Sequence, residues 1–104
     1  MTKFRNRMRP IHPGEILNED VLAPTGMSAN ALARELRVPV TRISEILYGR
    51  RAITADTALR LARYLGATAQ FWVNLQASYD LKFAEQTLGK KIAKEIQPRD
   101  PVAA

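Results

Sequence analysis

The chain has 104 residues, a formal net charge of +6 and a hydrophobic content of 46%. This length suits one small domain, and the hydrophobic fraction is enough for a single core. Cysteine is absent and His12 is the one histidine. Disulfides, thiolate metal sites and cysteine nucleophiles are therefore excluded, and we expect neither a metal nor a cofactor. The excess of basic residues favours an anionic partner such as nucleic acid.

Residues 1–11 are predicted to form a basic arm outside the folded domain. Pro10 opposes helix formation there, and no acidic residue balances the positive charge. No apolar stretch of signal-peptide or transmembrane length follows, so we predict a cytoplasmic protein without membrane contact. The sequence leaves open whether the arm is a solvated tail or contacts phosphates or a protein partner. Its basic residues are Lys3, Arg5, Arg7 and Arg9.

Residues 12–88 are predicted to form an all-α domain of five helices. The first begins after His12, with proline at the first helical position and an acid in the first turn, and Pro24 and Gly26 end it. We interpret His12 as a capping or packing residue, because no second histidine is present to share a catalytic role.

The segment of residues 28–49 contains two short helices separated by a break. Ser28 is an N-cap candidate for the first, and Pro39 separates it from the second, which spans about residues 40–48. Apolar residues recur at helical spacing in both helices. They are Ala29, Leu32, Ala33 and Leu36 in the first, and Ile43, Ile46 and Leu47 in the second.

Two further helices are predicted to start at Thr54 and Thr68, which are both N-cap candidates. The apolar stripe of the first contains Ala58, Leu61, Ala62 and Leu65, and that of the second contains Phe71, Trp72, Leu75 and Tyr79, continuing toward Phe83. We interpret the aromatic residues as core, with part of the cluster as a candidate dimer seam. Residues 89–104 are predicted to be a flexible tail.

The two short helices of residues 28–49 predict a helix-turn-helix, whose second helix enters the DNA major groove. Ala33 is small enough for the two helices to cross closely, and Ile43 anchors the second helix in the core. This pair resembles the motif of the phage-repressor (Xre/Cro-CI) family. Arg37 departs from it, because that turn usually holds glycine. Either Arg37 adopts a positive φ at a cost of about 1 kcal/mol, or Pro39 closes the turn differently.

Three further blocks resemble HigA-type antitoxins, also called virulence-associated protein I: His12–Leu17, Gly49–Ala62 and Phe71–Leu81. The resemblance implies a phage-repressor-like fold and a homodimer that binds a palindromic operator in double-stranded DNA. It also implies repression of the protein's own operon and neutralisation of a small, basic RelE-like ribonuclease toxin. No enzymatic activity is expected of such a protein.

Two other functions remain open at the level of sequence. The first is a protein-interaction module that binds a toxin without specific DNA recognition. The second is a small basic ribonuclease, which the single histidine and the all-α pattern disfavour.

Carrying the motif over by position gives two sets of candidate DNA contacts. Arg42 suits bidentate recognition of guanine, while Glu45 suits either cytosine N4 or a pairing with Arg42. The candidate base contacts are Pro39, Val40, Thr41, Arg42 and Glu45. The candidate phosphate contacts are Asn30, Ser44, Tyr48, Arg50 and Arg51.

Overall fold

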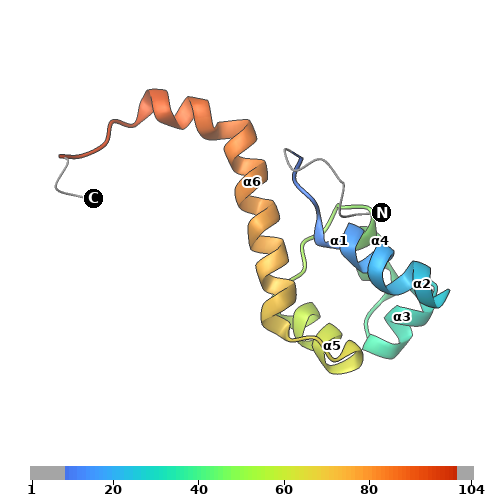
Figure 1. The fold of residues 1–104 in the computed structure, drawn as a ribbon. Helices are drawn as coiled ribbons and strands as arrows, with labels where there is room; N and C mark the ends of the chain where they lie inside the picture. Colours follow the sequence, from blue (N-terminus) through green and yellow to red (C-terminus); the bar gives the residue numbers. More distant parts are fainter. Residues whose placement is uncertain (1–8, 101–104) are drawn as a thin grey trace.

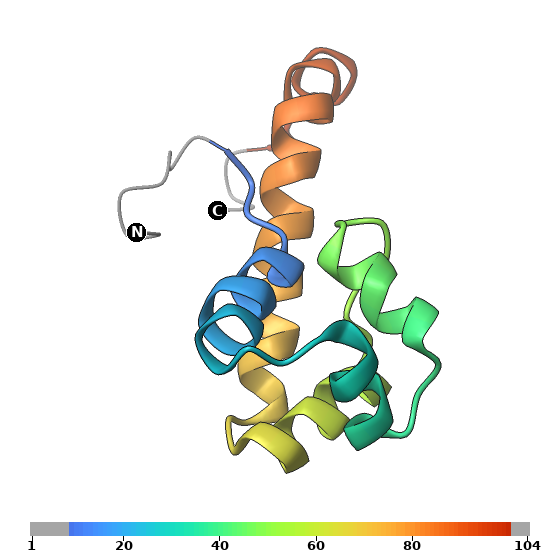
Figure 2. The same cartoon turned by 90° about the vertical axis from the view of Figure 1, so that its right-hand side faces the viewer.

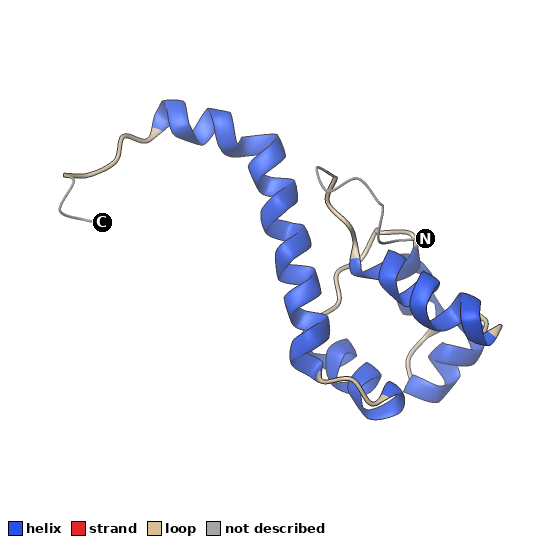
Figure 3. Cartoon of the chain, in the orientation of Figure 1, coloured by secondary structure: helices blue, strands red, loops and turns tan. Residues whose placement is uncertain are grey.

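The computed structural model describes residues 9–100, and within that range the fold is all-α with five helical segments and no strand (Figures 1 and 3). The first segment is continuous and comprises α1 (Pro13–Leu17), η2 (Asn18–Leu22) and α2 (Ala23–Thr25). The others are α3 (Ala29–Leu36), α4 (Val40–Leu47), α5 (Ala55–Leu65) and α6 (Ala69–Glu95). The predicted five-helix architecture is confirmed. Residues 1–8 of the predicted arm and 101–104 of the predicted tail lie outside the described range.

Helix starts coincide with the capping residues expected from the sequence. The hydroxyl of Ser28 accepts a hydrogen bond from the N–H of Ala31 at 3.0 Å, and that of Thr68 accepts one from Phe71 at 3.1 Å. Thr54 caps α5 in the same way. These bonds satisfy N–H groups that have no partner inside the helix, which is why each helix begins at that position.

The first helical segment contains one widened turn, the π-helical η2. The N–H of Ala23 donates to the carbonyl of Asn18, five residues earlier. Pro24 follows directly, and its ring cannot donate a hydrogen bond and crowds the preceding turn of a regular helix. The wider turn accommodates this proline. Gly26, at φ 71°, then ends the segment as predicted.

The core is built from the apolar stripes of the five helical segments, together with Ile53 of the loop before α5. Its buried hydrophobic residues are Leu17, Leu22, Leu32, Ala33, Leu36, Ile43, Ile46, Ile53, Ala58, Leu61 and Trp72. The aromatic cluster is only partly core: Phe71 is 44% exposed and Phe83 is 50% exposed. Trp72 lies on the face of α6 that packs on the rest of the domain. Phe71 lies on a different face, because successive residues of a helix are rotated by about 100° about its axis.

The last helix runs past the predicted end of the domain. Figures 1 and 2 show the other helices grouped around the first half of α6, with its second half extending beyond them. The prediction of a flexible tail from residue 89 is wrong for residues 89–95, which are helical. One glycine costs a helix about 1 kcal/mol, and the residues after Gly89 favour helix strongly enough to continue it. None of the helices described combines the length and the apolar character needed to cross a membrane.

The helices α1 and α4 approach each other closely where α1 meets the end of α4. A β-carbon built on Gly14 would lie 1.9 Å from the carbonyl oxygen of Ile46. Because backbone atoms cannot rotate away as a side chain does, only glycine fits at this position. Gly14 therefore sets how closely α1 approaches the last turn of α4.

Replacing Gly14 with alanine should lower the free energy of unfolding by about 3 kcal/mol or more, because overpacking against backbone cannot relax cheaply. Urea unfolding followed by circular dichroism measures this. Gly89→Ala is the matched control, since nothing lies within 4 Å of a β-carbon built there. That variant should be unchanged or more stable by up to about 1 kcal/mol. A Gly14→Ala protein as stable as the wild type would contradict the close packing of α1 on α4.

Candidate nucleic-acid interface

The predicted helix-turn-helix is formed by α3, a short turn and α4. Arg37 adopts the left-handed conformation, with φ 61° and ψ 44°, so of the two alternatives the positive φ is the one observed. The turn is closed by the N–H of Val38, which donates to the carbonyl of Ala33 at 3.0 Å. Pro39 then forms the N-cap of α4 in an extended conformation.

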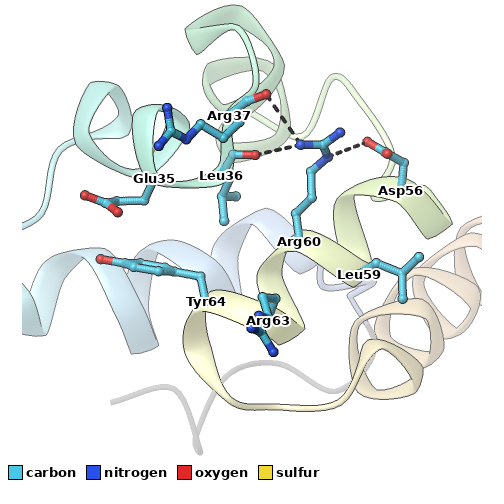
Figure 4. Close-up of a pocket in the computed structure, with 8 residues that line it drawn as sticks. All are labelled: Glu35, Leu36, Arg37, Asp56, Leu59, Arg60, Arg63 and Tyr64. Atoms are coloured by element: carbon cyan, nitrogen blue, oxygen red, sulfur yellow. Dashed lines mark hydrogen bonds and ion pairs between the residues drawn. The ribbon is translucent and has the colours of Figure 1, made fainter.

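Arg60 of α5 supports this turn from outside. Its Nη1 donates to the carbonyl of Leu36 at 2.9 Å and to that of Arg37 at 3.4 Å (Figure 4). Carbonyls at a helix C-terminus lack partners within the helix, so a cation there is favourable. Sequence reasoning missed this contact, because nothing in the local pattern links residues 24 positions apart.

The exposed face of α4 carries the small candidate residues. Ile43 and Ile46 are fully buried on the opposite face. Pro39, Val40, Thr41 and Tyr48 are exposed, and Ser44 is half-buried between them. Val40, Thr41, Ser44 and Tyr48 share one side of the helix, as spacings of three and four residues require. Ser44 and Tyr48, the predicted phosphate contacts, therefore lie on the same face as Val40 and Thr41, the predicted base contacts.

Arg42 lies on the flank of α4 that faces α5. Its Nη1 contacts Asp56 Oδ2 at 2.5 Å and the Thr57 hydroxyl at 3.4 Å. Asp56 also accepts from Nε of Arg60 at 3.0 Å. The hydrogen bonds from Arg60 and then Arg42 hold the pKa of the Asp56 carboxyl below its usual value, so this group is ionised at neutral pH. The guanidinium of Arg42 is thus fixed by a charged partner.

Glu45 pairs with Arg51, in the loop after α4, and the bond from Arg51 Nε to Glu45 Oε1 is 2.7 Å long. The predicted pairing of Glu45 with Arg42 is therefore wrong. Residues 42 and 45 are three positions apart and so are neighbours on the helix surface. Arg42 nevertheless bonds to Asp56 at the start of α5. The alternative role of Glu45, contact with a cytosine, stays a prediction.

The remaining candidates lie at the start of α3 and directly after α4. Arg50 lies over the exposed ring of Tyr48, 5.4 Å from its centroid, as a cation–π pair. Asn30 is exposed in the first turn of α3. The structure therefore brings Arg50, Arg51 and Tyr48 together at the C-terminal end of α4, whereas Asn30 lies on the other helix.

A side chain of α6 holds the loop after α4 in place. Gln76 is buried, its Oε1 accepts from the N–H of Ile53 at 2.8 Å, and its Nε2 donates to Asp80 at 3.0 Å. A buried amide with partners on both atoms fixes its surroundings. Gln76 thereby restrains the segment that carries Arg50 and Arg51. The burial of Gln76 was not predicted, because the prediction for this helix rested only on its apolar positions.

His12 connects α1 to the same region. Its Nδ1 accepts from the N–H of Gly14 at 2.9 Å, so the predicted capping role is confirmed. Its ring contacts Tyr79 of α6 edge-on, 4.8 Å between centroids. Burial lowers the pKa of His12, opposed in part by Asp80, Glu15 and a hydrogen bond to the backbone of Arg51. No group of acidic residues and histidine that could hold a metal ion occurs in residues 9–100.

The lowered pKa of His12 predicts a loss of stability in mild acid. Below about pH 6.5 the His12 side chain of the unfolded chain takes up a proton, whereas that of the folded chain resists protonation. The free energy of unfolding therefore decreases as the pH is lowered. Chemical unfolding between about pH 7.5 and 5.5 measures this slope. His12→Asn keeps a capping acceptor without a titrating ring, and its slope should be shallower. Parallel slopes for the two proteins would contradict the assignment, because the chain has no other histidine.

Comparison with known proteins agrees with this geometry. The helix-turn-helix family model matches residues 21–72, half of the chain. Virulence-associated protein I of Dichelobacter nodosus is 60% identical over 82 residues, covering 79% of this chain and 76% of that protein.

Two solved structures are similar over most of both chains. One is an addiction module antidote protein of the HigA family from Coxiella burnetii, with 56% identity and a TM-score of 0.83, covering 88% of this chain and 99% of that one. The other is the Pseudomonas aeruginosa antitoxin HigA with the higBA promoter, with 48% identity and a TM-score of 0.84, covering 86% and 98%. The chain belongs to the helix-turn-helix DNA-binding transcriptional regulators, and within them to the HigA-type antitoxins.

Proposed function

We propose that this protein is a sequence-specific repressor that binds an operator upstream of its own gene. The observation that carries the proposal is the exposed face of α4, where small side chains lie between Arg42 on one flank and the cluster of Tyr48, Arg50 and Arg51 at the end. Small residues allow close approach to base edges, and the arginines supply contacts to bases and phosphates. The similar Pseudomonas aeruginosa HigA was solved with promoter DNA, which supports the same ligand here.

The protein is proposed to act as a homodimer. Two copies would place two α4 helices in successive major grooves of a palindromic site, with half-site centres about 34 Å apart. Exposed apolar residues along α6, Leu81, Leu88 and Ile92, recur at spacings of seven and four residues and support a surface for a second chain. Because the proposed ligand is the operator, the proposed site of action is the cytoplasm.

The relatives are named antitoxin and antidote protein, which supports a toxin as second partner of this chain. As the resemblance of the sequence implies, we propose that this toxin is a small ribonuclease. No catalytic role is proposed for the antitoxin itself. Co-expression with the product of the adjacent gene and co-purification of the two chains test this part. If the purified protein still cleaves RNA after contaminating nucleases have been removed, the proposal that this chain has no catalytic role is contradicted.

Selective binding of the upstream DNA tests the repressor function. In fluorescence anisotropy, a duplex from upstream of the gene should bind at least about a thousandfold more tightly than a scrambled duplex of equal length. Both affinities should fall steeply between about 50 and 200 mM salt, because phosphate contacts release counterions. Equal affinity for the two duplexes would overturn the repressor function and leave the protein-interaction module.

Two arginine variants separate base contact from phosphate contact. Arg42→Ala should cost about 1–3 kcal/mol at one base pair of each half-site and relax specificity there. Arg50→Ala should weaken operator and scrambled duplex alike and reduce the salt slope by about 1. Anisotropy with operator variants substituted at each position distinguishes the two. Should Arg42→Ala weaken both duplexes equally, Arg42 is a phosphate contact.

A further inference from the structure

We propose that Asp56 is a positioning residue for base reading: its carboxylate holds the Arg42 side chain of α4 in the orientation that the operator requires. This rests on the proposed function and deepens it, because it adds a specificity-determining residue that does not itself touch DNA. The basis is a chain of contacts that joins α4, α5 and the turn after α3.

Two arginines converge on a single oxygen of Asp56. Oδ2 accepts from Arg42 Nη1 at 2.5 Å and from Arg60 Nε at 3.0 Å. The other end of the Arg60 guanidinium donates to the carbonyl of Leu36 at 2.9 Å (Figure 4). Asp56 is thereby linked to both helices of the motif, to α4 directly and to the C-terminus of α3 through Arg60.

Asp56 is itself well placed to act as a fixed point. It lies in the first turn of α5, where a negative charge is favourable, and α5 is anchored by the buried Ala58 and Leu61. Arg60, one turn later on the same helix, keeps the carboxylate in place. The side chain of Arg42 is only 28% exposed, so much of it is already packed before DNA arrives.

Fixing Arg42 in advance matters because its proposed contact depends on direction. A guanidinium distinguishes guanine through two parallel hydrogen bonds, and a misoriented fork forms one at best. A free arginine loses rotamer freedom on binding, whereas one already held by Asp56 loses less. The carboxylate therefore adds to the affinity for the correct base pair.

The same carboxylate opposes binding to DNA in general. Its negative charge lies beside the proposed interface, with 53% of its side chain exposed. Removing it makes the surface more positive, which strengthens contact with any phosphate backbone. Positioning and charge thus predict opposite effects on specific and non-specific DNA, and this opposition makes the proposal testable.

The test compares Asp56→Asn with the wild-type protein by anisotropy on the operator, the scrambled duplex and operator variants substituted at each base pair. Operator affinity should fall about tenfold, while affinity for the scrambled duplex stays equal or rises about twofold. The lost discrimination should lie at the base pair that Arg42→Ala affects. In the Arg42→Ala background, Asp56→Asn should cause no further loss there, because the two residues act through one contact.

Two variants control for charge and folding. Asp20→Asn makes the same change of net charge at an exposed position of η2, and it should leave the ratio of operator to scrambled affinity unchanged. Asp56→Glu keeps a carboxylate and should retain more of this ratio than Asp56→Asn. Thermal unfolding of each variant confirms that the folded proteins are being compared.

The outcomes separate the two levels of the proposal. If the wild type discriminates and Asp56→Asn keeps the ratio, or loses it at a base pair unrelated to Arg42, the positioning role is overturned and the repressor function stands. If the wild type binds both duplexes equally, both are overturned. If the ratio is kept because Asp56→Asn weakens both duplexes in proportion, the positioning role is likewise overturned, and Asp56 contributes only to the structure of the domain.

Discussion

The close approach of α1 to the last turn of α4 fixes the second helix of the helix-turn-helix in this fold. Gly14 lies against the Ile46 carbonyl, where any side chain would collide with backbone. Two residues earlier, His12 caps α1 and contacts Tyr79 of α6. The start of α1 is therefore packed against the end of α4 and against α6 at once. An isolated helix of eight residues is not stable in water. The packing on α1 therefore determines the orientation of α4 and of its exposed face.

The flank of α4 is fixed by charge. Arg42 and Arg60 share Asp56, and Arg51 pairs with Glu45. Exposed pairs such as these contribute at most about 1 kcal/mol each to stability. Their effect is on orientation, because each acid restricts where a long basic side chain can lie. In a chain with net charge +6, the few acids near α4 thus set the direction in which Arg42 and Arg51 lie.

Arg37 shows how a departure from the usual motif is accommodated. A left-handed arginine costs about 1 kcal/mol relative to glycine. The last carbonyls of a helix, here those at Leu36 and Arg37, also need partners from outside it. Arg60 donates to two of these carbonyls and so compensates for part of that cost. The strained turn and the contact to Asp56 are connected through the same guanidinium. Stability of the turn and orientation of Arg42 therefore depend on one another.

The sequence by itself determined the helices, their caps and the motif. Ser28, Thr54 and Thr68 act on N–H groups three residues away, and the apolar stripes repeat every three or four residues, so this information is local. The family resemblance likewise depends on short blocks that can be read directly. Only the end of the last helix was misplaced, because a single glycine does not stop a helix whose following residues favour it.

The tertiary structure alone decided which charged and aromatic side chains meet. Arg42 contacts Asp56 rather than Glu45, Arg60 reaches a carbonyl 24 residues away, and Phe71 faces outward beside the buried Trp72. Each of these results depends on the angle and distance between helices, which are set by packing across the whole core. A pattern in the sequence shows that a residue lies off the buried stripe, but the neighbouring helix determines what that residue contacts.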